Sequence, residues 1–141
     1  MPVIAYSMLN VQATLDGQKV TGLGDGDNAI EVAWGSDVGT PLVGADGTYL
    51  FSQSADQSAT ITIRVKPNSP THRQLTQKLA AQRAGRLTGF TFDVVDSGMN
   101  EGGTAVDCFI KTAPTDQKGT NAVVREWGIW SGNWTPLIPN P

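Results

Sequence analysis

Side chains that commonly carry protein chemistry are scarce in this chain. Its 141 residues include one histidine, His72, and one cysteine, Cys108. His72 falls at the third position of a predicted helix, where we expect a solvent-facing side chain and not a general base. Cys108 alternates with Val106 and Ile110, which is typical of a small buried residue and not of a reactive nucleophile. These patterns predict no catalytic residue.

Residues 22–28 have a composition that resembles two kinds of ligand-binding loop. Asp25-Gly26-Asp27-Asn28 is similar to the start of a calcium loop, but the spaced third ligand and the glutamate at position twelve are missing. Gly22-Leu23-Gly24 does not match the dinucleotide fingerprint, and the acidic residues beside it would repel a pyrophosphate. We therefore expect a tight turn here, with no metal and no cofactor.

Three of the four tryptophans, Trp127, Trp130 and Trp134, lie close together near the end of the sequence. An exposed cluster of this kind could stack on sugars, so a carbohydrate- or ligand-binding β-module is an alternative function. Packing in a core or an interface is the commoner use of tryptophan, because its side chain buries a large area. A small hydrolase is a further alternative, which the lack of a His, Asp and Glu constellation disfavours.

The strongest structural pattern is a strand–helix unit over residues 58–86. Residues 58–66 alternate apolar with polar side chains, as in a strand with one buried face and one wet face. A helix over about residues 70–84 follows, with a narrow apolar stripe of Leu75 and Leu79 that extends towards Ala80. We expect this helix to cover one side of a sheet.

The ends of this helix are marked by the residue types that cap helices. Ser69 is a good N-cap, and Pro70 fits the first helical position because its missing N–H costs nothing there. Gly85 is placed to end the helix in a left-handed conformation.

Other alternating segments predict further short strands. They cover residues 8–15, 28–35, 89–95, 104–111 and 123–131, with a hairpin turn at Asp16-Gly17. The inward sides of these strands are expected to carry Leu9, Val11, Ala13 and Leu15; Ile30, Val32 and Trp34; Phe90, Phe92 and Val94; Val106, Cys108 and Ile110; and Trp127 and Ile129. The predicted core comprises Ile61, Ile63, Val65, Leu75, Leu79, Phe90, Phe92 and Trp127. The C-terminal tail, residues 132–141, holds three prolines and is expected to be extended or loose.

Residues 36–57 have no strong core pattern and predict a long hairpin, which we call the arm. Its centre is the turn Gly44-Ala45-Asp46-Gly47, and each half of about ten residues would span roughly 33 Å at ~3.3 Å per residue. Long excursions of this kind are usually functional or disordered. The apolar content of the arm favours an ordered contact with another subunit. The predicted contact residues are Leu42, Val43, Asp46, Tyr49, Leu50 and Phe51.

Composition supports a mainly β fold: a small antiparallel β-barrel or sandwich with one flanking α-helix and the arm, in a single domain, residues 1–141. Sixteen glycines, eight prolines and only 16% charged residues suit many turns better than a helical bundle. The net charge of −3 disfavours a basic patch for nucleic acid. One cysteine permits no intrachain disulfide and fits a reducing compartment. No apolar run reaches the ~18 residues of a membrane span, so no membrane anchor is expected.

The segment GADGTYLFSQSADQSATITIRVKPNSPTHRQLTQKLAAQ closely resembles the tail tube proteins of contractile-tailed bacteriophages. More narrowly, it is similar to the small structural proteins of Mu-like prophages and related myophages. The matching features are Gly44–Gly47, the TITIRV strand, and Ser69-Pro70-Thr71 leading to Leu75. Tyr6–Leu15 and Glu126-Trp127 also look similar, so the likeness spans nearly the whole chain.

This resemblance implies a β-barrel with a flanking helix that forms hexameric rings, stacked into the inner tube through which DNA leaves the capsid. The implied partners are other copies of the chain, the surrounding tail sheath, the baseplate and tail-terminator proteins. The tape-measure protein and DNA would occupy the lumen without sequence-specific binding. The resemblance implies a component of the virion tail, assembled in the bacterial host cytoplasm, and no catalytic residue, metal or cofactor.

Overall fold

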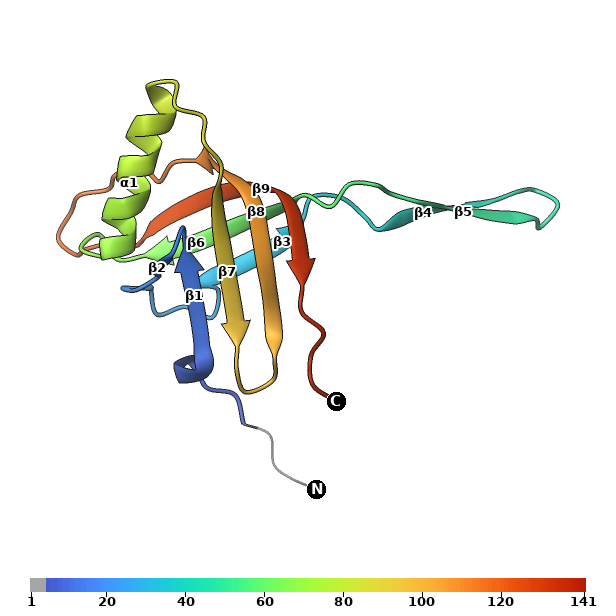
Figure 1. The fold of residues 1–141 in the computed structure, drawn as a ribbon, viewed down its shortest axis with the longest axis horizontal. Coiled ribbons are helices and arrows are strands. Elements are labelled where there is room, and N and C mark those ends of the chain that lie inside the picture. Colours follow the sequence, from blue (N-terminus) through green and yellow to red (C-terminus); the bar gives the residue numbers. More distant parts are fainter. Residues whose placement is uncertain (1–4) are drawn as a thin grey trace.

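A seven-stranded antiparallel sheet forms the body of the protein, and a two-stranded hairpin projects from it (Figure 1). The computed structural model describes residues 5–141; residues 1–4, which the single-domain prediction includes, lie outside the described residues. The sheet has the order β2-β1-β7-β8-β9-β6-β3. Its strands are β1 (Val11–Leu15), β2 (Gln18–Lys19), β3 (Ile30–Trp34), β6 (Ala59–Val65), β7 (Phe90–Asp96), β8 (Glu101–Thr112) and β9 (Arg125–Pro136). The hairpin consists of β4 (Gly39–Val43) and β5 (Tyr49–Gln53), and the helices are η1 (Met8–Asn10) and α1 (Pro70–Arg83).

The sheet curls over itself because its two longest strands, β8 and β9, bend along their length. Residues 125–131 of β9 pair with β6, while residues 128–136 pair with β8. In Figure 1, β1, β7 and β8 cross in front of β9, β6 and β3, so one continuous sheet provides both layers of a sandwich. The mainly β fold with one helix and an arm is confirmed. Of the predicted alternatives, the sandwich describes it, since β2 and β3 remain unjoined edges within residues 5–141.

A β-bulge in β8 changes which side chains face the core. Asp107 has φ +53° and interrupts the pairing with β7, so Ala105 and Cys108 both point inward. Val106, predicted to face inward with Cys108, is exposed instead. The extra residue shifts the two-residue alternation by one position.

A close backbone approach at the start of β8 requires a glycine. Gly102 has φ +147°, and a Cβ atom added there would lie 2.0 Å from the carbonyl oxygen of Val94. No side chain fits at that distance, so β7 and β8 can approach each other this closely only with glycine at position 102.

The core lies between the two layers of the curled sheet. In β6, every second residue from Ala59 to Val65 is buried, as expected for a strand with one inward face. The structure buries Ile61, Ile63, Val65, Leu75, Phe90, Phe92 and Trp127, and packs the partly buried Leu79 against them.

Helix α1 closes one end of the sandwich. Gln74 donates from its side chain to the carbonyl of Leu15 (2.9 Å), and the Gln82 amide exchanges two hydrogen bonds with the backbone of Ile110 (2.8 and 3.1 Å). Leu15 and Ile110 lie at the C-terminal ends of β1 and β8, so the helix bridges strand ends. It therefore does not simply cover one side of a sheet, and Ala80 of the predicted stripe is exposed.

Three further positions differ from the sequence-based expectation. Leu9 is 92% exposed because residues 8–10 form a 3-10 helix, capped by Ser7, that precedes β1. Trp34 is 48% exposed at the end of the edge strand β3. Gly132–Pro136, predicted to belong to a loose tail, continue β9 along β8 and bury Trp134.

The helix contact with the core gives a stability prediction. Leu75 is fully buried and Leu79 only partly, so Leu75→Ala should lower the free energy of unfolding by about 2–5 kcal/mol and Leu79→Ala by less. Urea unfolding of both variants measures the difference. Equal losses would contradict the view that Leu75 is the anchor of the helix.

Candidate functional site

The arm extends away from the body and packs along none of it (Figure 1). β4 and β5 form a separate two-stranded sheet, in which Leu42 pairs with Leu50 and Val43 with Tyr49. Every residue of β4 and β5 except Gly39 is exposed. The arm is therefore a ribbon that holds its shape through its own ladder of hydrogen bonds.

Both faces of this ribbon are apolar. Side chains of cross-strand partners share a face, and successive pairs alternate between faces. One face carries Leu42 and Leu50, and the other carries Val43, Tyr49 and Phe51, with Pro41 opposite Phe51. Apart from Pro41, each of these side chains is at least 60% exposed. Monomeric proteins rarely expose a contiguous apolar surface of this kind without a partner for it.

Hydrogen bonds fix the tip and the base of the arm. At the tip, Thr48 donates from its hydroxyl and its N–H to Asp46 (2.7 and 3.1 Å), and these two bonds lower the pKa of Asp46. At the base, Ser36 and the N–H of Ser58 donate to Asp56 (2.9 Å each). Bonds from Ser58 and Ser36 lower the pKa of Asp56 as well. The polar residues of the arm thus shape the ribbon, and its apolar residues remain free.

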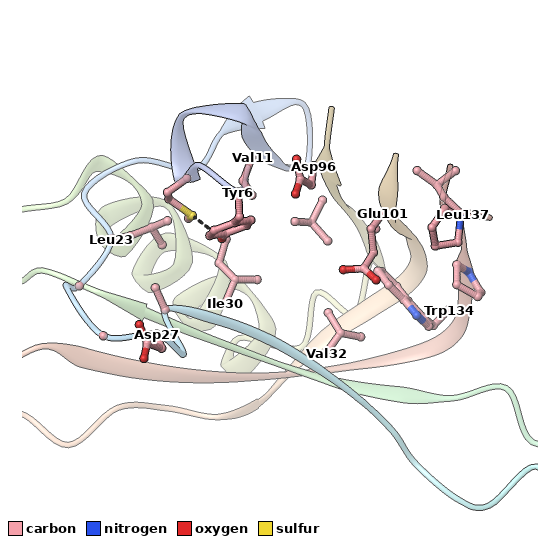
Figure 2. Close-up of a pocket in the computed structure, with 18 of the residues that line it drawn as sticks. Tyr6, Val11, Leu23, Asp27, Ile30, Val32, Asp96, Glu101, Trp134 and Leu137 are labelled. Carbon is pink, nitrogen blue, oxygen red and sulfur yellow. Dashed lines mark hydrogen bonds between the residues drawn. The ribbon is translucent and has the colours of Figure 1, made fainter. Parts of the chain in front are cut away.

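The end of the sandwich opposite α1 is open and forms a groove of about 1060 Å³ (Figure 2). Its apolar lining includes Leu23, Ile30 and Val32 from the β3 side and Val11 and Val94 from the β1–β7 side. Acidic side chains stand around it: Asp25, Asp27, Asp96 and Glu101. None of the four forms an ion pair within residues 5–141. The groove thus combines an apolar floor with a negative rim.

His72 is partly buried, contrary to the expectation of a solvent-facing side chain. Its Nδ1 accepts a hydrogen bond from the indole Nε1 of Trp127 (3.1 Å), and the two rings lie 5.7 Å apart. Burial, and next the nearby Arg125, lower the pKa of His72, while Asp116 opposes this shift. The geometry favours a neutral imidazole that supports Trp127, with its Nδ1 occupied as an acceptor.

The three clustered tryptophans do not form a common platform. Trp127 lies in the core, Trp134 is buried at the other end of β9, and Trp130 faces outward from the sheet. Alternation along β9 separates Trp130 from Trp127. The surface on which the carbohydrate-binding alternative depends is therefore not assembled.

Within residues 5–141, neither Cys108 nor the loop of residues 25–28 is arranged for chemistry. Burial raises the pKa of the Cys108 thiol to about 11, so this side chain stays protonated at neutral pH. Across the described part of the chain, no group of three His, Cys, Asp or Glu residues could hold a metal ion. Residues 5–141 also contain no helix long and apolar enough to cross a membrane.

The six predicted contact residues all lie on the arm: Leu42, Val43, Asp46, Tyr49, Leu50 and Phe51. Sequence reasoning missed the groove, because its lining comes from β1, β3, β7, β8 and β9. It also missed Leu87, which is 69% exposed after α1. The sequence did hold a signal for Leu87: it is an apolar residue, between Arg86 and Thr88, that belongs to no alternating pattern.

Comparison with known families gives a match over nearly the whole chain. The family model described as "Bacteriophage PhiTE tail tube protein" matches residues 3–136. Among curated protein sequences, none matches this chain.

Solved structures of tube components share the fold at low sequence identity. A chain of the extracellular contractile injection system PVC sheath–tube complex in its extended state has a TM-score of 0.62 and 11% identity, covering 94% of this chain and 90% of that one. A chain of the PVC sheath/tube terminator has a TM-score of 0.56 and 13% identity, covering 94% and 96%. The anti-feeding prophage tube-terminating cap has a TM-score of 0.52 and 13% identity, covering 96% and 94%.

The lowered pKa of His72 predicts a pH dependence of stability. The unfolded chain takes up this proton near the ordinary value of 6.5, whereas the folded chain takes it up at lower pH. The free energy of unfolding should therefore be highest above pH 6.5 and fall as the pH drops from 6.5 through the folded pKa. Urea unfolding between pH 7.5 and 5 measures it.

His72→Gln is the control for this prediction, because glutamine does not titrate and its side-chain oxygen can accept from Trp127. In this variant the fall between pH 6.5 and 5 should disappear. Asp46, Asp56 and Asp116 have pKa values below 3.8 in the folded chain, so their effect lies at more acidic pH. An identical pH profile in parent and variant would rule out His72 as the cause.

Proposed function

The chain belongs to the bacteriophage PhiTE tail tube protein family, and we propose that its copies form hexameric rings that stack into the inner tube of a contractile phage tail. A tail tube protein is a structural component of the virion tail. The proposal adds the ring, the stacking and the passage of DNA through the lumen. The observation that carries it is the arm, whose two apolar faces are left exposed by the rest of residues 5–141.

Burial of the arm would stabilise the assembly. Each of Leu42, Leu50, Val43, Tyr49 and Phe51 gains about 1.5–3 kcal/mol when an exposed side chain of its size becomes fully buried. A single partner surface covers only one face of a ribbon. Both faces of the arm are therefore buried only when it lies between two neighbouring subunits. Around a ring this contact repeats with every copy.

Ring closure would also resolve the open edges of the sheet. β3 exposes unpaired backbone groups along one side, and such an edge invites pairing with other chains. If the sheets of neighbouring subunits continue one another around the ring, each edge receives a partner. A ring of this kind uses heterologous contacts, and stacking uses a second set.

The proposed partners follow from the position of the tube in a tail. The sheath would surround it, terminator and baseplate proteins would close its ends, and the tape-measure protein and DNA would occupy the lumen. The solved neighbours support the sheath and the terminator as partners, since they come from a sheath–tube complex and a tube terminator. Assembly in the host cytoplasm is compatible with one buried, unpaired cysteine. In this role the protein works through its surfaces, without catalysis.

The arm can be tested by replacing Val38–Asp56 with a short Gly-Ser linker. The body should remain folded with near-normal thermal unfolding, because the arm contributes nothing to its core. The variant should fail to form long tubes in negative-stain micrographs, while the parent forms them. In the isolated parent subunit, hydrogen exchange should be fast across residues 38–56.

Matched variants separate the two faces of the arm. Leu42→Ser with Leu50→Ser alters one face, and Tyr49→Ser with Phe51→Ser alters the other. Thr40→Ala with Ser52→Ala serves as the control, because it changes the same ribbon without removing an apolar side chain. Both apolar pairs should impair tube formation and the control should not.

If the linker variant polymerises as well as the parent, the arm is not the stacking element, and the C-terminal residues 137–141 become the better candidate.

The charge of the bore gives a second test. DNA must slide through it, so we expect acidic or uncharged polar side chains on the sheet face that lines it, in keeping with the net charge of −3. Thr60 and Thr62 face outward from β6 and are candidates. Thr60→Lys with Thr62→Lys should leave tubes intact and slow DNA ejection from phage particles. Serine at both positions is the control, and equal ejection rates for lysine and serine would exclude this face.

A further inference from the structure

The two ends of the sandwich have opposite character. One end is closed by α1, and the other is the open groove with its apolar floor and acidic rim (Figure 2). The groove is open to an occupant, and the arm is poorly suited to that place. Asp37, Asp46 and Asp56 are the only side chains within residues 36–57 that are charged at neutral pH, so the arm would bring like charge to the rim.

The closed end carries the complementary charge. Arg83 and Arg86 lie on either side of the end of α1, and Lys111 lies at the end of β8 beside them. All three side chains are exposed, and none forms an ion pair with another residue of the range 5–141. Leu87, the residue after Arg86, is 69% exposed. The acidic residue Asp107 lies against Gly89, which ends this connection.

The backbone at this end is fixed. Gly85, at φ +91°, donates to the carbonyl of Gln82 (3.1 Å), and the N–H of Arg86 donates to that of Ala81 (3.0 Å). These two bonds form the Schellman motif that ends a helix. The backbone is therefore fixed as far as Arg86, and Leu87 follows it directly.

The two surfaces lie at opposite ends of β7. Leu87 precedes the first residue of this strand by three positions, and Asp96, its last residue, lines the groove. Seven strand residues separate them by roughly 23 Å. Two complementary surfaces at opposite ends of one subunit make a heterologous contact, which can repeat without limit along an axis.

We propose that Arg83, Arg86 and Leu87 of one copy occupy the acid-rimmed groove of the next copy along the tube. Leu87 contacts the apolar floor formed by Ile30 and Val32, and the arginines approach the acidic rim. The closed end of each subunit thereby seats in the open end of its neighbour. This inference rests on the proposed function and adds to the arm a second, charge-dependent stacking contact.

Arg64, which contacts the loop that lines the groove, does not pair with the acidic rim. Arg64 donates to the carbonyl of Asn28, and its guanidinium also faces Glu31 (3.7 Å) and Glu126 (3.4 Å). Its charge is thus shared between two other carboxylates. Asp25, Asp27 and Glu101 are exposed and remain available to a partner.

Charge reversal tests the contact. Arg83→Glu with Arg86→Glu should raise the critical concentration for tube formation at least about tenfold, because it sets like charges against the rim. Arg73→Glu with Lys66→Glu is the control, since it makes the same change in charge at exposed cations away from the C-terminal end of α1. Light scattering and micrographs report tube formation, and thermal unfolding verifies that each variant is folded.

Rescue supplies the specific readout. Asp27→Lys with Glu101→Lys should also impair assembly, and a chain that carries all four reversals should recover it. Tubes of the parent should weaken as salt rises, because added ions screen the contact. As a direct measurement, chains with Leu87→Cys mixed with chains with Asp27→Cys should form disulfide-linked pairs on oxidation, with the buried Cys108 excluded.

The outcomes separate this inference from the proposed function. If the parent forms tubes and both charge-reversed chains form them equally well, the inference is overturned and the tube function stands. If the four-reversal chain does not recover assembly, or the mixed cysteine chains do not cross-link, the pairing is likewise wrong. A parent that stays monomeric in every condition would overturn the proposed function and this inference with it.

Discussion

The bend of β8 and β9 is the constraint on which the structure depends. Each strand has twelve residues, and β9 pairs with β8 of one layer and with β6 of the other, so one sheet can fold over its own apolar face. Without this bend, β6 and β7 would present Ile61, Ile63 and Phe92 to solvent on a flat sheet. The bend rests on local features: the bulge at Asp107, a second irregularity next to Lys111, and the glycine at position 102. Bulges of this kind increase the local twist and turn the corner of a sheet.

Curling a single sheet leaves two open ends, and the chain treats them differently. At one end α1 fills the opening with Leu75 and satisfies strand-end backbone groups through Gln74 and Gln82. At the other end the apolar interior remains accessible. This asymmetry gives the subunit a direction along β7. A directional subunit with an uncovered arm suits an open-ended assembly better than a closed dimer, in which the same patch would face itself.

The polar residues that first suggest chemistry serve the architecture. His72 accepts from Trp127 and holds the helix against β9. Arg125 is buried with its guanidinium on the carbonyl of Val123 (2.7 Å) and close to Asp116 (3.4 Å), which ties the loop before β9 to the body. Breaking a buried, paired charge of this kind is strongly destabilising. In the proposed tube, repeated subunit contacts would benefit from this rigidity.

The sequence by itself determined the elements whose signals are local. These elements are the strand over residues 58–66, the helix that starts at Ser69-Pro70 and ends at Gly85, and the long apolar arm. Their signals are side-chain periodicity and cap residues, which depend only on residues close together in the chain. Tertiary structure alone decided where Val106, Trp34 and Trp134 lie: a bulge turns Val106 outward, Trp34 ends an edge strand, and β9 continues along β8 far enough to bury Trp134. It also decided the groove, whose walls come from five strands far apart in sequence. No local pattern encodes a surface that exists only once a sheet has curled and one of its ends has stayed open.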